Sequence, residues 1–162
     1  MALDKRNMLR HLIATLAYRG TKSIKNAPGH YPEFHAGKGV RTPREILAHI
    51  SGVLTYAHSC FEHYYTTSFK TESWEKEVER FYGILGVLDE SLSEKMPMDV
   101  TVEQLLQGPF SDAMTHVGQL ALLRRLADDP VPAENFIYAS IKIGQTGPEQ
   151  PEPVAPDKTE NS

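Results

Sequence analysis

The spacing of the prolines restricts the fold of this chain more than any other feature of its sequence. Eleven prolines occur among 162 residues, and they gather in three regions, 28–43, 97–109 and 130–156. A helix interior rarely contains proline, because the ring clashes with the preceding turn and the backbone N–H is missing. The long proline-free intervals between these regions are therefore the segments in which we expect helices.

Apolar residues recur at helical spacing within these intervals. Between Trp74 and Lys95 the chain carries a stripe at steps of three and four, made of Val78, Phe81, Leu85, Leu88 and Leu92. Such a stripe is typical of an amphipathic helix that packs on a core. The same pattern predicts four long helices, at about 4–26, 42–65, 74–95 and 109–127.

Helix-start signals support these boundaries. Thr42 is followed by a proline and then by Glu45, which is a capping-box pattern with proline at the first helical position. Ser73 is placed to cap the third helix. Thr101 and Gln104 repeat the box and predict one or two helical turns before the fourth long helix.

These elements predict a single all-α domain, a four-helix bundle over residues 1–145. Residues 26–41 mix glycine, proline and aromatic residues, and we interpret them as a loop. Residues 131–145 are apolar enough to pack on the bundle and are expected to be ordered but irregular. The short C-terminal extension, residues 146–162, is acidic and proline-rich with little apolar surface, so we expect it to be disordered.

Charge and cysteine content exclude several classes of protein. The net charge is −4 at pH 7, most of the excess acid lies in the tail, and the body contains no basic block. The body therefore has no electrostatic footprint for nucleic acid or an anionic membrane. Cys60 is the single cysteine, which excludes an intrachain disulfide, and the apolar stretches are too interrupted for a membrane span. We expect a cytoplasmic protein.

Histidine and aspartate residues are placed where they could bind a metal ion. Asp112 and His116 are four residues apart in the predicted fourth helix, so both side chains point to one side of one turn. His49 lies among aliphatic residues of the second helix and is expected to face inward. The three would form a site of two histidines and one carboxylate with open positions. The alternative is a chance D-x₃-H pattern beside a hydrogen-bonded core histidine.

Two neighbouring residues have two interpretations each. Tyr56 lies two turns beyond His49 and would bind substrate or cofactor at the mouth of the site, or be a tyrosine buried between helices. Gln119 follows His116 by three residues. It would support the ligands or line the pocket, or else form a hydrogen bond between helices.

Two longer stretches carry a family resemblance. RTPREILAHISGVLTYAH, around His49, is followed some fifty residues later by FSDAMTHVGQLALLRRLADDPVPAENF, around His116. Together they resemble the DinB-like (DinB/YfiT-like) metalloenzyme superfamily, over residues of about 5 to 145. The resemblance implies a four-helix bundle in up-down-down-up order that is often dimeric.

The resemblance also implies a metal site. In the superfamily a divalent ion is held by one histidine of the second helix and by an H-x₃-H pair of the fourth. His49 and His116 match two of these ligands, and Asp112 stands where the family more often has histidine. Aspartate also binds such ions. The implied cofactor is a divalent metal ion held by all three residues, with zinc or nickel favoured over manganese or iron.

The activity that the resemblance implies is that of a metal-dependent enzyme, a thiol transferase or a hydrolase that acts on a small molecule. A low-molecular-weight thiol is an implied partner and a homodimer the implied assembly. The alternative function is non-catalytic, a metal-binding or dimerisation bundle associated with stress response. Asp112 keeps this alternative open, as does the lack of an evident general base in the sequence.

Overall fold

The computed structural model describes residues 4–62 and 70–157. The regular structure of these residues is helical, and they contain no strand beyond one isolated β-bridge between Glu134 and Pro156. The elements are α1 (Lys5–Ile24), α2 (Pro43–Glu62), α3 (Trp74–Glu94), α4 (Val102–Leu105), the π-helical turn η1 (Leu106–Phe110), α5 (Ser111–Leu126) and the 3₁₀ turn η2 (Phe136–Tyr138). The prediction of an all-α fold is confirmed. The predicted end of the second helix, near Tyr65, lies outside the described residues.

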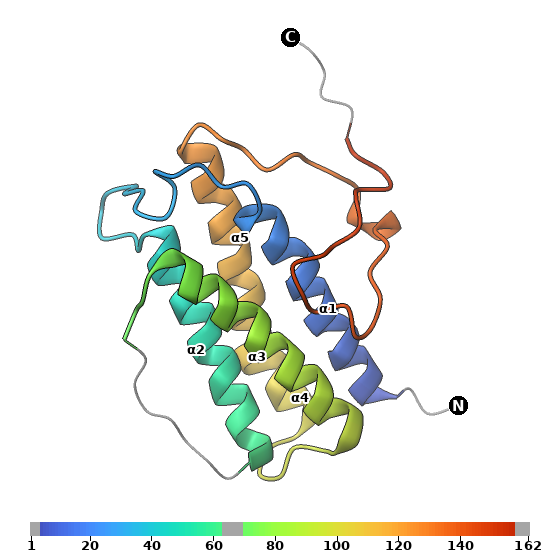
Figure 1. Ribbon diagram of the computed structural model, residues 1–162. Coiled ribbons are helices and arrows are strands. Elements are labelled where there is room, and N and C mark those ends of the chain that lie inside the picture. Colours follow the sequence, from blue (N-terminus) through green and yellow to red (C-terminus); the bar gives the residue numbers. More distant parts are fainter. Residues whose placement is uncertain (1–3, 63–69, 158–162) are drawn as a thin grey trace.

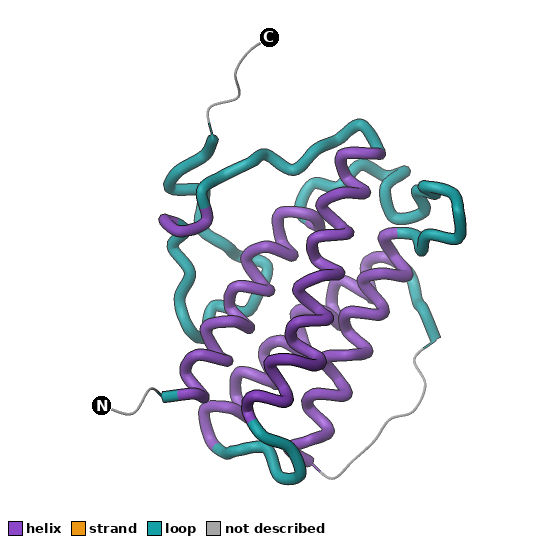
Figure 2. The backbone as a smooth tube through the Cα atoms, turned by 180° about the vertical axis from the view of Figure 1, so that it is seen from behind, coloured by secondary structure: helices purple, strands orange, loops and turns teal. Residues whose placement is uncertain are grey.

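The four long helices lie side by side around one core. In Figure 1, α1 and α5 run in one direction, whereas α2 and α3 run in the other. Both α1 and α2 pack against α3 and α5. The view from behind shows the connecting loops at the two ends of the helices (Figure 2). The arrangement makes α2 and α5, which carry the candidate metal ligands, direct neighbours.

The helix starts use the caps that the sequence predicts. The Thr42 backbone N–H donates to Glu45 Oε2 over 2.8 Å, and the Glu45 N–H donates to Thr42 Oγ1 over 3.3 Å. Ser73 accepts from a backbone N–H of the first turn of α3. Thr101 and Gln104 form a reciprocal capping box at α4. These contacts satisfy backbone donors that a helix start would otherwise leave without partners.

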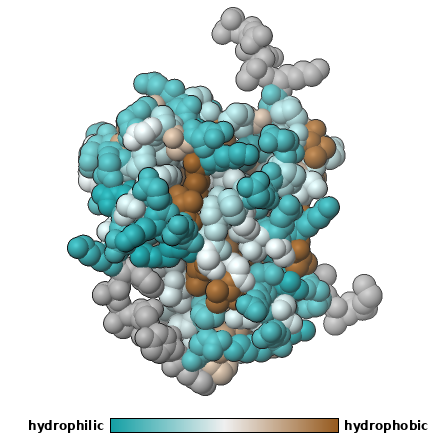
Figure 3. All heavy atoms as spheres, in the orientation of Figure 1, coloured by the Kyte–Doolittle hydropathy of each residue, from teal (hydrophilic) through white to brown (hydrophobic). Residues whose placement is uncertain are grey.

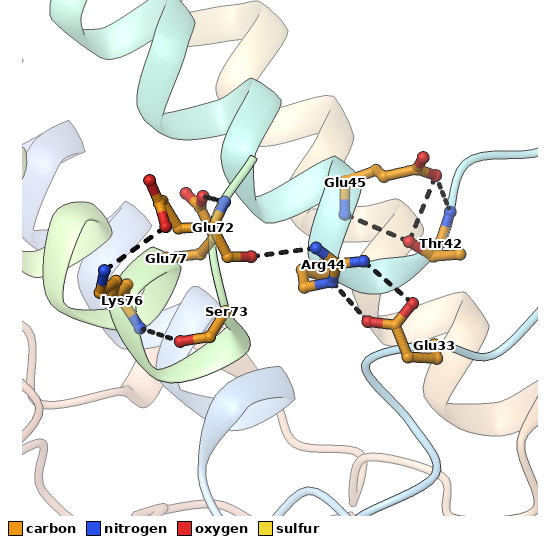
Figure 4. A network of polar contacts seen from close by, with 8 residues as sticks. All are labelled: Glu33, Thr42, Arg44, Glu45, Glu72, Ser73, Lys76 and Glu77. Atoms are coloured by element: carbon orange, nitrogen blue, oxygen red, sulfur yellow. Dashed lines mark hydrogen bonds and ion pairs between the residues drawn. The ribbon is translucent and has the colours of Figure 1, made fainter. Parts of the chain in front are cut away.

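A polar network joins the start of α2 to the start of α3 (Figure 4). The Arg44 guanidinium forms an ion pair with Glu33 and donates to the Glu72 carbonyl oxygen over 3.0 Å. The Glu72 N–H in turn donates to the carboxylate of Glu77, which is fully buried and also pairs with Arg80. The network therefore connects the loop before α2 to the segment that enters α3.

The loop before α2 is also anchored in the core. Tyr31 is fully buried, and its hydroxyl donates to the Leu120 carbonyl oxygen of α5 over 2.8 Å. Its ring meets the ring of Trp74 edge to face. Burial raises the pKa of Tyr31 well above its ordinary value. An aromatic anchor of this kind holds the predicted loop in one conformation.

Of the C-terminal segment that we expect to be disordered, the structure describes residues 146–157, and residues 158–162 lie outside the described residues. Residues 155–157 lie beside residues 133–135, where the Asn135 N–H donates to the Ala155 carbonyl oxygen and the Asp157 N–H donates to the Ala133 carbonyl oxygen. Glu134, buried between them, accepts from the Tyr18 hydroxyl and pairs with Lys22 of α1. Backbone hydrogen bonds and this partnered carboxylate hold the segment, so its low apolar content does not prevent order.

The face drawn in Figure 3 is mostly hydrophilic, with a few separate apolar spots. Within the part of the chain that the structure describes, no helix has the length and apolar character needed to cross a membrane.

Gly20 allows α1 to approach α3 closely. A Cβ atom at this position would lie 2.6 Å from the Phe81 ring, whereas a Cβ atom at the exposed Gly83 would meet nothing within 4 Å. We predict that Gly20→Ala lowers the free energy of unfolding by about 1–3 kcal/mol because of overpacking. Gly83→Ala should raise it by up to about 1 kcal/mol, through helix propensity. Urea unfolding of both variants checks this; equal effects would contradict it.

Removal of residues 146–162 should destabilise the protein. The deletion removes both hydrogen bonds to residues 133–135 and uncovers Glu134. We expect the melting temperature to fall by about 3–8 °C, since about 1 kcal/mol corresponds to a few degrees at this chain length. Asp157→Pro, which removes one N–H donor, should cause a smaller decrease. Calorimetry measures both, and an unchanged melting temperature after the deletion would show that the segment does not support the fold.

Candidate metal centre

The structure brings together the three ligands that the sequence singles out. His49 of α2 and the pair Asp112 and His116 of α5 each offer one ligand atom, and these atoms all lie within 4.8 Å of one another. No other group of three or more such side chains with this spacing occurs among residues 4–62 and 70–157. The convergence requires α2 and α5 to be neighbours, which the packing of the helices provides.

Local structure sets the direction of each ligand. His49 lies in the second turn of α2, whose start is fixed by the capping box at Thr42. Asp112 lies in the first turn of α5, after the η1 turn that contains Pro109 and a non-helical backbone at Gly108. His116 follows one turn later, so its ring lies above the Asp112 carboxylate on the same side of α5.

The tautomer of the neutral His116 ring is set by a backbone contact. Its Nδ1 lies 2.8 Å from the Asp112 carbonyl oxygen. A carbonyl oxygen accepts hydrogen bonds and cannot donate, so Nδ1 carries the proton of the neutral ring. The lone pair of that ring is then on Nε2. A backbone hydrogen bond of this kind is the usual means by which proteins orient a metal-binding histidine.

His49 contacts both partners across the helix interface. Its Nε2 lies 3.2 Å from Asp112 Oδ2, and its ring centroid lies 4.5 Å from that of His116. The pKa of His49 is lowered, first by burial and then by the electrostatic effects of His116 and Arg41, while Asp112 acts in the opposite direction. A lowered pKa favours the neutral ring, which is the form that binds metal ions.

The three side chains are partly open to solvent. Their exposed fractions are 31% for His49, 43% for Asp112 and 14% for His116. Two open hollows adjoin them. One, of about 410 Å³, is lined by His49 together with Arg41, Glu45, Ala48, Gly52, Val53 and Thr71. The other includes Asp112, Tyr56 and Thr115. An ion held by the three ligands would therefore keep coordination positions within reach of small molecules.

The two neighbours predicted for substrate or cofactor binding have different positions. Tyr56 is 52% exposed and lines the same hollow as Asp112, so the alternative of a tyrosine buried between helices is wrong. Gln119 is exposed on α5 and lines neither hollow. Its side chain forms no hydrogen bond with another described residue, which gives no support to a bond between helices.

Arg41 and Thr71 are site residues that sequence reasoning missed. Arg41 precedes the cap of α2, and Thr71 lies in the segment that enters α3. Arg41 directly precedes the capping box of the helix that carries His49. A basic residue in that place is a signal that could have indicated it. Thr71 has no local signal, because it joins His49 at the hollow through tertiary packing rather than through its sequence neighbours.

Comparisons with known proteins add no assignment. No family model, no curated protein and no solved structure matches this chain. The chemistry of the centre therefore has to be argued from its own residues. Two imidazoles and a carboxylate form a mixed nitrogen and oxygen donor set that suits zinc, nickel, iron or manganese, and this set does not identify one ion.

The charges around His49 predict how its pKa responds to substitution in protein freed of metal by a chelator. Asp112→Asn should lower the pKa of His49 further, because a carboxylate that favours the protonated ring is removed. Arg41→Gln should raise it, because a repelling charge is removed. Histidine NMR titration measures both. His58 is the internal control, since its pKa is lowered by burial and affected by Glu62 and Lys95. Parallel shifts of His49 and His58 would contradict the prediction.

Proposed function

We propose that this protein is a metal-dependent enzyme of the DinB-like superfamily, a thiol transferase or a hydrolase that acts on a small molecule. The observation that carries the proposal is the convergence of His49, Asp112 and His116 within 4.8 Å beside an open hollow. A divalent ion bound there would lower the pKa of a thiol or water and so supply a nucleophile at neutral pH.

The arrangement of helices supports the family assignment. The directions of α1, α2, α3 and α5 agree with the up-down-down-up order that the resemblance implies. The motif residues around His49 and His116 lie on the two helices that face each other. We further propose the cytoplasm as the location of the protein, a homodimer as its assembly and a low-molecular-weight thiol as one substrate.

Each side chain has a separate part in this proposal. His49 and His116 bind the ion as neutral rings, and the hydrogen bond from His116 Nδ1 holds that ring in place. Asp112 supplies a negative charge that offsets part of the charge of the ion. Tyr56, exposed beside Asp112, places a hydroxyl where a substrate would enter.

A second candidate function is a non-catalytic metal-binding or dimerisation bundle. The hollow beside His49 contains one carboxylate, that of Glu45, and this group accepts two hydrogen bonds from Thr42. It is therefore committed to the helix start and poorly suited to act as a general base. Leu122 and Leu126, both exposed on α5, offer apolar contact area for dimerisation.

Metal titration tests the proposal. We expect protein purified without a metal column to bind one equivalent of cobalt or zinc. His116→Ala should weaken binding at least about 100-fold, because the loss of a ligand's outer hydrogen-bond partner alone costs about 10–100-fold. Asp112→His, which creates an H-x₃-H pair, should retain stoichiometric binding, whereas Asp112→Ala should not. Calorimetry measures the affinities, and circular dichroism checks that each variant is folded.

Two further results separate the candidate functions. His11→Ala removes an exposed histidine of α1 and should leave the affinity unchanged; equal losses in the His11 and His116 variants would indicate adventitious surface binding. A small thiol should produce a thiolate charge-transfer band in the cobalt protein if a coordination position is open. Cobalt that stays bound without any response to thiols would favour the non-catalytic bundle.

A further inference from the structure

The hollow beside His49 contains a cation that no other described residue neutralises. Arg41 lines this hollow, and its side chain is exposed. Among residues 4–62 and 70–157, it forms no ion pair and no hydrogen bond. Arg44, three residues later, is engaged by Glu33 and by the Glu72 carbonyl oxygen. Arg41 therefore presents a guanidinium group whose donors are not taken by any other described residue.

The carboxylate that lines the hollow forms no ion pair with Arg41. Glu45 accepts the N–H and the hydroxyl of Thr42, over 2.8 and 3.2 Å, and its charge serves the start of α2. The charge of Arg41 instead reaches His49, on which its electrostatic effect is resolved. Arg41 and His49 line the same hollow, so the guanidinium lies beside the candidate centre.

The overall charge of the loaded centre favours an anion. With both rings neutral, a divalent ion bound to Asp112 and flanked by Arg41 and Glu45 leaves an excess of one positive charge at the hollow. A positive excess in a concave site concentrates anions. A substrate that places a negative group at Arg41 would balance it.

We propose that Arg41 is a specificity-determining residue that binds the carboxylate of a small substrate whose reacting group lies at the metal centre. This inference rests on the proposed function and names the class of its substrate. The planar guanidinium matches a carboxylate in a two-pronged contact. Thr71, on the same hollow, adds a hydroxyl donor, and about 410 Å³ accommodates a small molecule.

The test compares thiols of similar size and different charge on the cobalt-loaded protein. The probes are 3-mercaptopropionate, 2-mercaptoethanol and cysteamine, and the thiolate band reports their affinity. Arg41→Gln should weaken 3-mercaptopropionate about fivefold relative to 2-mercaptoethanol, and Arg41→Lys should retain part of the preference. Cysteamine should bind more tightly to Arg41→Gln than to the wild type. Equal changes for all three thiols would overturn the proposal.

Two controls sharpen this comparison. Arg125→Gln removes an exposed arginine near the end of α5 and should leave the thiol preference unchanged. Propionate and methyl phosphate are compared as competitors of 3-mercaptopropionate. Stronger competition by propionate supports a carboxylate, whereas stronger competition by methyl phosphate would overturn that assignment.

The failure of the proposed function can be told apart from the failure of this inference. If cobalt does not bind, or binds without responding to thiols, the metal-dependent activity is what fails. The metal-free protein then tests Arg41: propionate, but not propionamide, should shift the backbone amide NMR signals of Arg41 and Thr71, and Arg41→Gln should abolish the shifts. No difference between propionate and propionamide would overturn the proposal.

Discussion

The packing of α2 against α5 is the contact on which the candidate centre depends, because neither helix carries three ligands alone. Asp112 and His116 give two donors on α5, and His49 gives the third from α2. Leu47 and Ile50 beside His49, like Ala113 beside Asp112, are fully buried. A shift of one residue turns a helix by about 100°, which would expose these side chains and separate the ligands. Core packing therefore fixes the geometry of the chemistry.

Contacts at the helix starts fix the residue at which α2 begins, and so fix which of its side chains face α5. The capping box of Thr42 and Glu45 fixes the first residue of α2, and Arg44 connects that turn to the loop before it and to the segment that enters α3. Arg41 is attached directly to this cap, so its position follows from the same contacts. The network in Figure 4 and the lining of the hollow thus draw on one short stretch of chain, and Glu45 belongs to both.

Local patterns in the sequence predict much of this structure, and long-range contacts explain the rest. Proline spacing and capping boxes locate the helices, and the four-residue spacing of Asp112 and His116 places both on one turn. The order of residues 146–157 depends on hydrogen bonds to residues 133–135 and on contacts of Glu134 with α1. An argument from composition counts apolar side chains, so it does not detect hydrogen-bond partners that lie far away in the sequence. The exposure of Tyr56 likewise depends on which sides of α2 its neighbours cover.

The charge of Asp112 also affects how an ion would be held beside Arg41. On the proposed function, a neutral histidine at position 112 would still bind the ion, but the donor set would then carry no negative charge. The exposed guanidinium of Arg41 would lower the affinity for the ion only modestly, because solvent screens its charge. The carboxylate of Asp112 offsets one positive charge, so the ion and the guanidinium can lie beside the same hollow. The lowered pKa of His49 completes this balance, because a neutral ring binds the ion without first losing a proton. On the proposed function, Asp112 and Glu45 would thus offset part of the positive charge that an ion and Arg41 bring to this part of the molecule.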